Sequence, residues 1–408
     1  MTDKQVEKIR KDFSWFSNNK GWCYFDSGAT SLKPKFVLDK EREYYEKYGC
    51  NPHNNDSLFA WKSHQLVKES RDEIANLLNC NSQEIIFTSG ATESLNLIAN
   101  GLSKYVKKND EILLTYIEHT SNMLPWFNLS KKTQGEVVFV GKNKVPNEKD
   151  ILSTLTKNTK IVAFCDVSNI LGSYIDCNSL AKKIKKYNKD IIVVVDATQS
   201  IPHIKHNLKD SAIDFLVFSG HKMLAPMGIG VCYMNKKWIN KIDPIKFGGG
   251  MNSIVDHNKK TFTYAEGIDK FEGGTQNVGG ICGLGAAIKY LNEIGWNNIT
   301  KHEWELKEYF NNKVHLIKNI EYYNPNNHLG IIYFNIKGVS AQDLANYLGS
   351  KKIIVRSGLS CAKAANVSTN INSAARISLY IYNTRKEIDY LIKILKNLKK
   401  GDVLNNVI

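Results

Sequence analysis

The chain has 408 residues, of which 42% are hydrophobic and 23% are charged, so it can bury a large core. Its net charge is +15, but the lysines are spread along the chain as solvated helix faces, and we do not expect nucleic acid to be its partner. The charged N-terminus lacks the apolar segment of a signal peptide, and no apolar run is long enough to cross a bilayer. We therefore expect a soluble protein of the cytoplasm rather than a secreted or membrane-spanning one.

The cysteines form no recognisable framework. They stand at positions 23, 50, 80, 165, 177, 232, 282 and 361. No CxxC pair and no His/Cys spacing typical of a metal site occurs among them, so we expect no metal. Most lie in apolar stretches such as VAFCDV and IGVCYM, which predicts buried free thiols rather than disulfides in a reducing compartment.

Short apolar runs alternate with amphipathic helical patterns from about residue 24 to residue 285. The predicted strands are 23–26, 84–89, 111–115, 137–140, 160–167, 191–197, 214–219 and 230–234. Helical patterns between them include 93–106 and 178–188. Continuous runs rich in β-branched residues are typical of strands buried on both faces, and their alternation with helices predicts an α/β fold with a mostly parallel, doubly wound sheet. Residues 24–285 are thus expected to form a large domain.

The pattern changes after residue 285. A long helical stretch over 285–317 precedes the apolar run 330–336, a helix over 341–348 and a closing helix that begins at Arg385. This order predicts a smaller α+β domain over 286–408, which the N-terminal segment 1–23 is expected to join. No linker rich in Pro, Gly or Ser separates the two parts, so a rigid interface between them is expected.

Two polar stretches follow strands in the first half of the chain. The junction at 84–102 places Ala91 and Thr92 at the start of a helix, where backbone N–H groups can bind phosphate. Taken alone, this is an ordinary helix cap. His119 stands in YIEHTSNMLPW (116–126), and in isolation it would be a core or turn histidine. Beside a cofactor ring, an imidazole can also stack and transfer protons.

A carboxylate and an amine follow two later strands. Asp196 comes directly after the apolar run of IIVVVDATQS (191–200), where a charge needs a partner, either the backbone or a cationic ligand. Lys222 lies in the tight turn of DFLVFSGHKMLAPMGIG (214–230). A lysine in such a place is better explained as a reactive amine that forms a Schiff base with an aldehyde cofactor such as pyridoxal 5′-phosphate (PLP). Asp196 would then hold the proton on the pyridine nitrogen.

Together these segments resemble the cysteine desulfurases, class V enzymes of the fold-type I PLP group, close to the SufS-like branch. The resemblance runs from FDSGATSLKP (25–34) to RKEIDYL (385–391). Between these ends the matching segments are, in order, EHTSNMLPW, DVSNILGSYID, VVVDATQS, FSGHKMLAPMGIG, FEGGTQN and VRSGLSCA. The resemblance implies the fold-type I architecture of a large and a smaller domain, and PLP as the cofactor.

The resemblance also implies the cofactor contacts. By position, Lys222 matches the lysine that binds PLP, Asp196 the partner of the pyridinium nitrogen, His119 the residue stacked on the ring and Gln199 the residue near the phenolic oxygen. The implied phosphate contacts are Ala91, Thr92, Ser219, His221 and Thr275. Thr275 matches a threonine that reaches the phosphate of the partner subunit, which implies a homodimer with shared active sites.

Three residues match the substrate side of the family site. Asn169 corresponds to a residue beside cofactor and substrate, and Arg376 to the arginine that holds the substrate carboxylate. Cys361, in VRSGLSCAK (355–363), corresponds to the nucleophile. Arg356 and Lys363 are near in sequence and favour its thiolate. A free cysteine is otherwise a small apolar residue, but the polar stretch that follows Cys361 is typical of a loop.

The chain departs from the family pattern at a few positions. Leu359 and Ser360 stand where the branch usually has two histidines, and Gly28 stands where it usually has alanine. These differences bear on the rate of turnover, on the position of the loop that carries Cys361 and on the choice of the protein that accepts the sulfur. They leave the preference between cysteine and selenocysteine open.

The resemblance implies an enzyme that converts L-cysteine to L-alanine and leaves a persulfide on Cys361. The sulfur would pass to an acceptor protein of iron–sulfur cluster assembly. The alternatives are a selenocysteine lyase, or another class V lyase or transaminase. A further alternative is a non-catalytic binding protein that retains PLP, such as a scaffold or a basic nucleic-acid binder.

Overall fold

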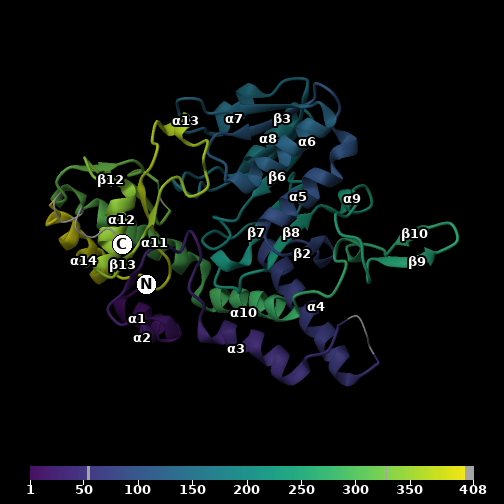
Figure 1. Cartoon of the computed structure of the whole chain (residues 1–408), viewed down its shortest axis with the longest axis horizontal. Helices are drawn as coiled ribbons and strands as arrows, with labels where there is room; N and C mark the ends of the chain where they lie inside the picture. Colours follow the sequence, from purple (N-terminus) through teal and green to yellow (C-terminus); the bar gives the residue numbers. More distant parts are fainter. Residues whose placement is uncertain (53–55, 328, 400–408) are drawn as a thin grey trace.

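A sheet of seven strands forms the centre of the larger lobe in this computed structural model, which describes residues 1–52, 56–327 and 329–399 (Figure 1). In spatial order the strands are β2 (Ile85–Thr88), β8 (Gly230–Met234), β7 (Phe215–Ser219), β6 (Ile192–Asp196), β5 (Thr159–Cys165), β3 (Glu111–Thr115) and β4 (Glu136–Val140). The five strands from β7 to β4 are parallel, and β8 runs antiparallel to both of its neighbours. The predicted mostly parallel α/β sheet is confirmed.

Helices cover both faces of this sheet because its central strands are apolar on both sides. In β6, Val193 and Val195 pack into one core, while Ile192 and Val194 pack into the other. The first core includes α8 (Cys177–Tyr187), and the second includes α5 (Ala91–Gly101). The other helices of this lobe are α3 (Lys35–Glu43), α4 (Leu58–Leu78), α6 (Leu124–Thr133), α7 (Glu148–Thr154), α9 (Lys236–Ile239) and α10 (Val278–Ile294). Within the described residues, no helix has both the length and the apolar character needed to cross a membrane.

The C-terminal part of the chain forms a second, antiparallel sheet. Its strands, in spatial order, are β11 (Ile320–Tyr322), β12 (Ile331–Ile336), β15 (Ala375–Ser378) and β14 (Arg356–Ser357). Its helices are α11 (Trp296–Asn311), α12 (Ala341–Ser350), the single turn α13 (Asn366–Thr369) and α14 (Arg385–Lys396). The helical stretch expected over 285–317 is two helices that meet at Gly295, which has a positive φ of 88°. The domain boundary at residue 285 stays a prediction, and α10 runs through it without a break.

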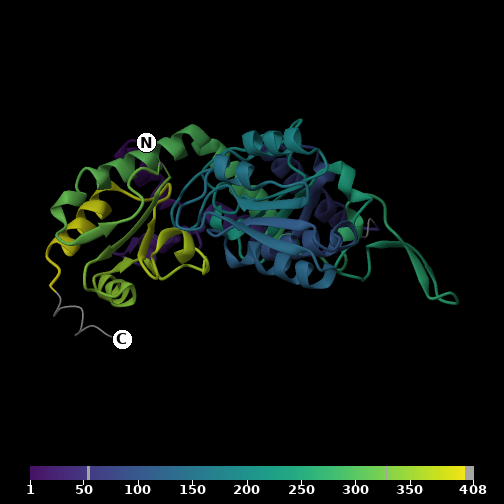
Figure 2. The same cartoon turned by 90° about the horizontal axis from the view of Figure 1, so that it is seen from above.

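The N-terminal segment packs against this second part (Figure 2). β1 (Cys23–Tyr24) pairs in parallel with β13 (Ile353–Ile354), and Arg10 of α1 (Asp3–Lys11) forms an ion pair with Glu387 of α14. The strand predicted at 23–26 therefore does not join the large sheet, contrary to its place in the predicted alternation. The reason is that Cys23 and Phe25 are buried in the core beneath the small sheet.

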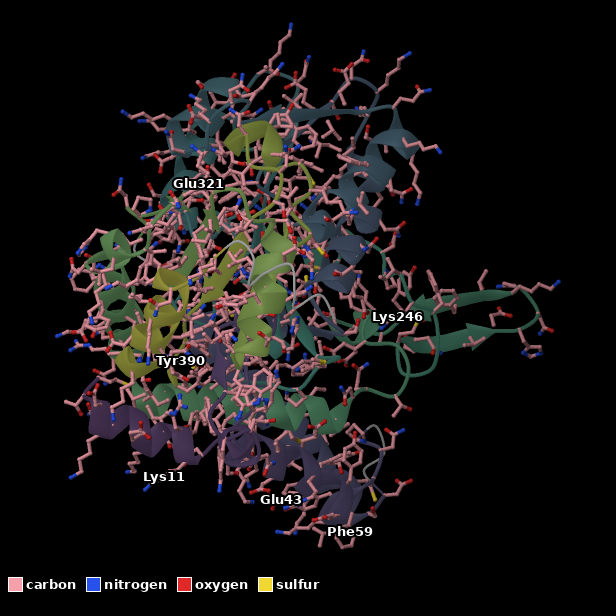
Figure 3. The ribbon with its side chains drawn as sticks, turned by 60° about the vertical axis from the view of Figure 1, so that its left-hand side comes forward. Lys11, Glu43, Phe59, Lys246, Glu321 and Tyr390 are labelled. Atoms are coloured by element: carbon pink, nitrogen blue, oxygen red, sulfur yellow. The ribbon has the colours of Figure 1, made fainter. Side chains whose placement is uncertain are left out.

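A two-stranded ribbon projects from the larger lobe. It is formed by β9 (Asn252–Asp256) and β10 (Thr261–Tyr264), and it extends away from the body in both views (Figures 1 and 2). Ile254, Val255 and Phe262 are exposed on it. Figure 3 labels Lys246 near the base of the ribbon. No sequence pattern predicted it, because exposed side chains leave no alternation of buried and polar positions.

Candidate active site

A cavity of about 230 Å³ lies where the carboxyl ends of β5 and β6 and the turn after β7 meet the loop before β15. The residues singled out from the sequence that line it are Ala91, Thr92, His119, Asn169, Asp196, Gln199, Ser219, His221, Lys222, Cys361 and Arg376. Thr275 is exposed and does not line this cavity. The fold therefore brings together residues that are distant in sequence, with Thr275 as the exception.

Lys222 and Asp196 follow neighbouring parallel strands. Lys222 ends the short 3-10 turn η5 (Gly220–Lys222) after β7, and Asp196 is the last residue of β6. Burial lowers the pKa of Lys222 to about 8, while the Asp196 carboxylate raises that pKa in opposition. Oδ1 of Asp196 accepts a hydrogen bond from the backbone N–H of Thr198 at 3.0 Å. Near neutrality this site holds an amine close to its titration point, next to a carboxylate.

The turn that carries Lys222 is fixed by the segment FDSGATSLKP (25–34), whose individual residues were given no role from the sequence. The carbonyl oxygen of His221 accepts hydrogen bonds from Ser31 N at 3.0 Å and from the hydroxyls of Thr30 and Ser31 at 3.1 Å each. Nζ of Lys33 donates to the same oxygen at 3.0 Å, and burial lowers the pKa of Lys33 to about 8. Four donors on one carbonyl oxygen leave the backbone beside Lys222 little freedom to move.

Groups suited to an anion lie at the start of α5. The backbone N–H of Ala91 donates to Oγ of Ser219 at 2.9 Å, and the hydroxyls of Thr92 and Ser121 are 2.7 Å apart. His221 Nδ1 is buried and has no hydrogen-bond partner among the described residues. Burial lowers the pKa of His221 to about 4, and nearby Lys222 acts in the same direction. A helix N-terminus with hydroxyls and an unpaired ring nitrogen is a suitable place for phosphate.

His119 is oriented by its own turn. Its Nδ1 accepts the backbone N–H of Ser121 at 3.1 Å, as the N-cap of η4 (Thr120–Asn122). Any proton on the neutral ring therefore lies on Nε2. Burial, and then the charge of Lys222, lower the pKa of His119. The ring is thus a neutral imidazole at neutral pH, which suits stacking and proton transfer.

Arg376 is buried, and one of its three nitrogens makes no hydrogen bond within the described residues. Its Nη1 donates to the carbonyl oxygen of Asn169 at 2.7 Å, and its Nη2 donates to Oδ1 of Asp26 at 3.0 Å. Nε is buried and unpaired within the described part of the chain. Asp26 also forms an ion pair with Arg356, at 3.4 Å from Nε. An anionic group in the cavity would find a fixed guanidinium with an unused N–H.

Asp26 was missed by sequence reasoning, and Arg356 was considered only for the thiolate. Gly28 makes room beside this pair of arginines, because a Cβ there would lie 2.9 Å from Oγ of Ser378 and 3.3 Å from Cζ of Arg376. The Asp-Ser-Gly that follows the short N-terminal strand is the one local signal that could have pointed to this part of the site.

The loop that carries Cys361 is held by the larger lobe. Gly358, Ser360 and Cys361 have positive φ values of 87°, 44° and 62°, of which the last two are costly for residues with a Cβ. The carbonyl oxygen of Cys361 accepts hydrogen bonds from the backbone N–H of Thr120 at 2.8 Å and from its hydroxyl. Asn169 Nδ2 donates to the carbonyl oxygen of Ser360 at 2.7 Å. Three hydrogen bonds thus hold a strained loop with an exposed thiol over the cavity.

Comparisons with known families, sequences and solved structures point to the same group of proteins. The model of the aminotransferase class-V family matches residues 23–391. A probable cysteine desulfurase of Ureaplasma parvum is 48% identical over 99% of this chain and 100% of its own length. The apo structure of a cysteine desulfurase from Thermococcus onnurineus superposes with a TM-score of 0.91 at 34% identity, over 97% of this chain and 98% of that one.

A more distant solved structure carries the cofactor. It is a variant of C-DES with glycine covalently linked to its PLP. It superposes with a TM-score of 0.82 at 18% identity, and it covers 96% of this chain and 99% of that one. At this identity the likeness is one of fold.

Replacing Thr120 by Val should loosen the Cys361 loop. The change removes the hydroxyl donor to the Cys361 carbonyl oxygen, and one hydrogen bond contributes about 0.5–1.5 kcal/mol. Opening of the loop should increase about 2- to 10-fold, because 1.4 kcal/mol is a factor of ten. The rate at which a bulky maleimide alkylates Cys361 measures this opening. Thr120→Ser, which keeps a hydroxyl, should react like the wild type, and equal rates for Thr120→Val and the wild type would refute the role of this contact.

Lys222 of the apoprotein should react with an acylating reagent as an amine of low pKa. Its labelling, followed by mass spectrometry across a pH series, should be half-maximal near pH 8, whereas ordinary lysines need about pH 10.4. In Asp196→Asn the midpoint should move to lower pH, because the carboxylate is the group that raises this pKa. A midpoint near that of the exposed lysines would show that Lys222 is not desolvated.

Proposed function

The chain belongs to the aminotransferase class-V family, among its cysteine desulfurases, and on this basis we propose that Cys361 takes the sulfur of L-cysteine and that L-alanine is the other product. The observation that carries the proposal is the common cavity of Cys361, Lys222 and Arg376. A nucleophile, a basic amine and a carboxylate-binding cation are the three protein groups that this reaction needs.

The residues around the cavity fit PLP, the cofactor of this family. Lys222 offers the amine for its aldehyde, and Asp196 offers a carboxylate for its ring nitrogen. The phosphate would be held at the start of α5 by Thr92, Ser219 and His221, whose unpaired Nδ1 then gains a partner. Gln199 donates from Nε2 to the carbonyl oxygen of Gly28 at 2.8 Å, so its side chain is already fixed at the cavity wall.

When bound, PLP supplies an aldehyde that combines with the substrate amine and a ring that withdraws electrons from the substrate Cα. Arg376 holds the substrate carboxylate through N–H groups that its contacts with Asn169 and Asp26 leave unused, and Asn169 fixes both the guanidinium and the loop. Lys222 takes the Cα proton, which its lowered pKa allows near neutrality.

The thiolate of Cys361 then attacks the substrate sulfur. A sulfur–sulfur bond forms, the carbon–sulfur bond breaks, and its electron pair stays with the substrate carbon. That carbon takes up a proton from a nearby acid, for which His119 is positioned, and L-alanine is released. Cys361 keeps the persulfide, and we propose that its outer sulfur goes to an acceptor protein of iron–sulfur cluster assembly in the cytoplasm.

Selenocysteine is the main alternative substrate. Leu359 and Ser360 replace the usual histidines before the nucleophile, and Ser360 Oγ is buried without a partner in the described chain. The carbon–selenium bond of the substrate breaks more easily than a carbon–sulfur bond, so a selenocysteine lyase can turn over its substrate without a cysteine nucleophile. Turnover of selenocysteine by a variant without the Cys361 thiol separates the two activities.

The variant Cys361→Ala should keep bound PLP and lose turnover of L-cysteine by up to roughly 10⁶-fold, the scale seen when a catalytic nucleophile is removed. Alanine and sulfide release with a reductant measure turnover. In the wild type, mass spectrometry after brief exposure to L-cysteine should find one added sulfur atom on Cys361. Cys50→Ser is the control, because it alters a partly exposed thiol outside the cavity and should behave as the wild type. If Cys361→Ala still turned over L-cysteine, the assignment of the nucleophile would be wrong.

We further propose that two copies of the chain share their sites. Thr275 is exposed and does not line its own cavity, as expected of a residue that serves a partner. Large apolar side chains are exposed together on α3, the π-helical turn η1 (Tyr44–Tyr48) and the start of α4, namely Phe36, Leu38, Tyr45, Leu58, Phe59 and Trp61. Figure 3 shows Phe59 at the outer end of this region. A single chain rarely leaves so many large apolar groups in water without an interface.

Light scattering should give the mass of two chains for the wild type and of one chain for the double variant Phe59→Asp/Trp61→Asp, since buried carboxylates would disrupt the interface. Tyr187→Asp changes an exposed aromatic residue on α8 and should remain dimeric. A monomeric wild type with full activity would exclude shared sites.

A further inference from the structure

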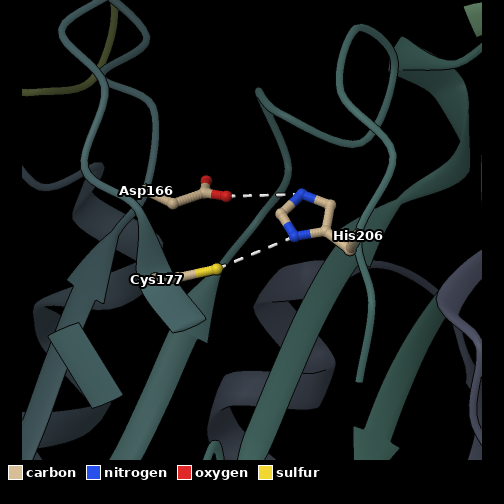
Figure 4. Close-up of side chains that lie close together, drawn as sticks. All are labelled: Asp166, Cys177 and His206. Carbon is tan, nitrogen blue, oxygen red and sulfur yellow. Dashed lines mark hydrogen bonds and ion pairs between the residues drawn. The ribbon is translucent and has the colours of Figure 1, made fainter. Parts of the chain in front are cut away.

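A second group of reactive side chains lies outside the lining of the cavity. Asp166 directly follows β5, Cys177 begins α8, and His206 belongs to the loop between β6 and β7 (Figure 4). One ligand atom from each of the three lies within 4.8 Å of the others, and all three side chains are buried. None of the proposed catalytic steps uses them.

The hydrogen bonds around His206 define its tautomer. Its Nε2 lies 2.9 Å from Oγ of Ser200, and the single hydroxyl proton of Ser200 is donated to the carbonyl oxygen of Ala197 at 3.1 Å. With the Ser200 proton so placed, Nε2 carries the ring proton and donates it to Ser200. Nδ1 keeps its lone pair, and this nitrogen faces Sγ of Cys177 at 3.7 Å.

The spacing of this nitrogen and this sulfur suits a metal ion. Zinc binds sulfur at about 2.3 Å and imidazole nitrogen at about 2.0–2.1 Å, so a tetrahedral site separates the two ligands by about 3.6 Å. An imidazole whose second nitrogen donates to a fixed oxygen is the usual arrangement of a ligating histidine. The N–H of His206 toward Ser200 supplies that second contact.

The carboxylate of Asp166 lacks compensation for its burial. It has no exposed surface, and neither oxygen has a hydrogen-bond partner among the described residues. Nε2 of His206 lies 3.4 Å from its Oδ2, but burial lowers the pKa of His206 to about 4, so this ring is neutral and offers no charge. Without a cation, burial raises the pKa of Asp166 to about 8, so the side chain is a neutral acid near neutral pH, whereas a bound cation would favour the carboxylate.

We infer that Asp166, Cys177 and His206 form a zinc site. Nδ1 of His206 and the thiolate of Cys177 would be two ligands, and the Asp166 carboxylate, turned from Nε2 toward them, would be the third. The fourth position is left to water or to the second carboxylate oxygen. One thiolate and one carboxylate balance the charge of Zn²⁺, so the group can stay buried without a net charge.

A metal ion here would tie together three segments that support the active site. Cys165, the neighbour of Asp166, lines the cavity, as do Thr198 and Gln199 of the loop that leads to His206. The same ion would fix the start of α8 against both of these segments, the end of β5 and the loop after β6. The expected role is structural, and it adds no step to the sulfur chemistry.

The zinc content of the holoenzyme tests this inference. The protein is purified after expression with added zinc sulfate, passed over a desalting column and analysed by mass spectrometry of the metals. About one zinc per chain is expected in the wild type, and less than about a tenth in Cys177→Ser and His206→Gln. Two controls should keep the metal. Cys232→Ser changes another buried thiol outside the cluster, and Cys361→Ala removes the one exposed thiol in the described chain.

X-ray absorption at the zinc edge of the wild type decides the case even if the two ligand variants fail to fold. One sulfur among nitrogen and oxygen ligands is expected. A wild type that holds less than about a tenth of a zinc ion after equilibration with excess zinc would overturn the inference. So would zinc that has no sulfur ligand, or zinc that is lost in Cys361→Ala and kept in Cys177→Ser. In those cases the three groups are a hydrogen-bonded cluster without metal.

Discussion

The desolvation of one amine constrains the rest of this molecule. The pKa of Lys222 is lowered to about 8 because the surrounding protein removes much of the water from its amine, although the side chain still lines the cavity. The nearby carboxylate of Asp196 opposes this effect, because its attraction for the ammonium limits how far the pKa of Lys222 falls. The four donors on the His221 carbonyl oxygen keep the amine in this environment. The packing around the carboxyl ends of the parallel strands therefore also sets the chemical properties of the site.

The two lobes meet at the groups proposed to bind the substrate. Arg376 belongs to the small sheet, yet its guanidinium is held by Asn169 from the larger lobe and by Asp26 after the N-terminal strand. Asn169 also holds the backbone of Ser360. A shift of one lobe against the other would disturb the guanidinium and the thiol loop at once. Such shared contacts explain why no flexible linker is needed between the lobes.

The sequence predicted most elements of the large sheet because their apolar runs are continuous, as burial on both faces requires. It also predicted eleven of the residues that line the cavity, a few from polar motifs that follow strands and most from the family resemblance. It did not predict the ribbon at 252–264, whose side chains are exposed, nor the place of 23–26, which pairs with a strand far along the chain. The group of Asp166, Cys177 and His206 was missed for a similar reason. Its members come from three elements and have no spacing typical of metal ligands.

The hydrogen bonds between Thr120 and Cys361 set a limit on how sulfur can leave. A sulfur–sulfur bond is about 2.05 Å long, so a loaded Cys361 would present its outer sulfur only that far beyond Sγ. With the loop held as it is, that atom stays at the mouth of the cavity. An acceptor must then either insert a narrow, extended group to reach it, or compete with Thr120 for the carbonyl oxygen of Cys361 and draw the loop outward. The shape of the acceptor, more than its affinity, would decide between these two routes of delivery.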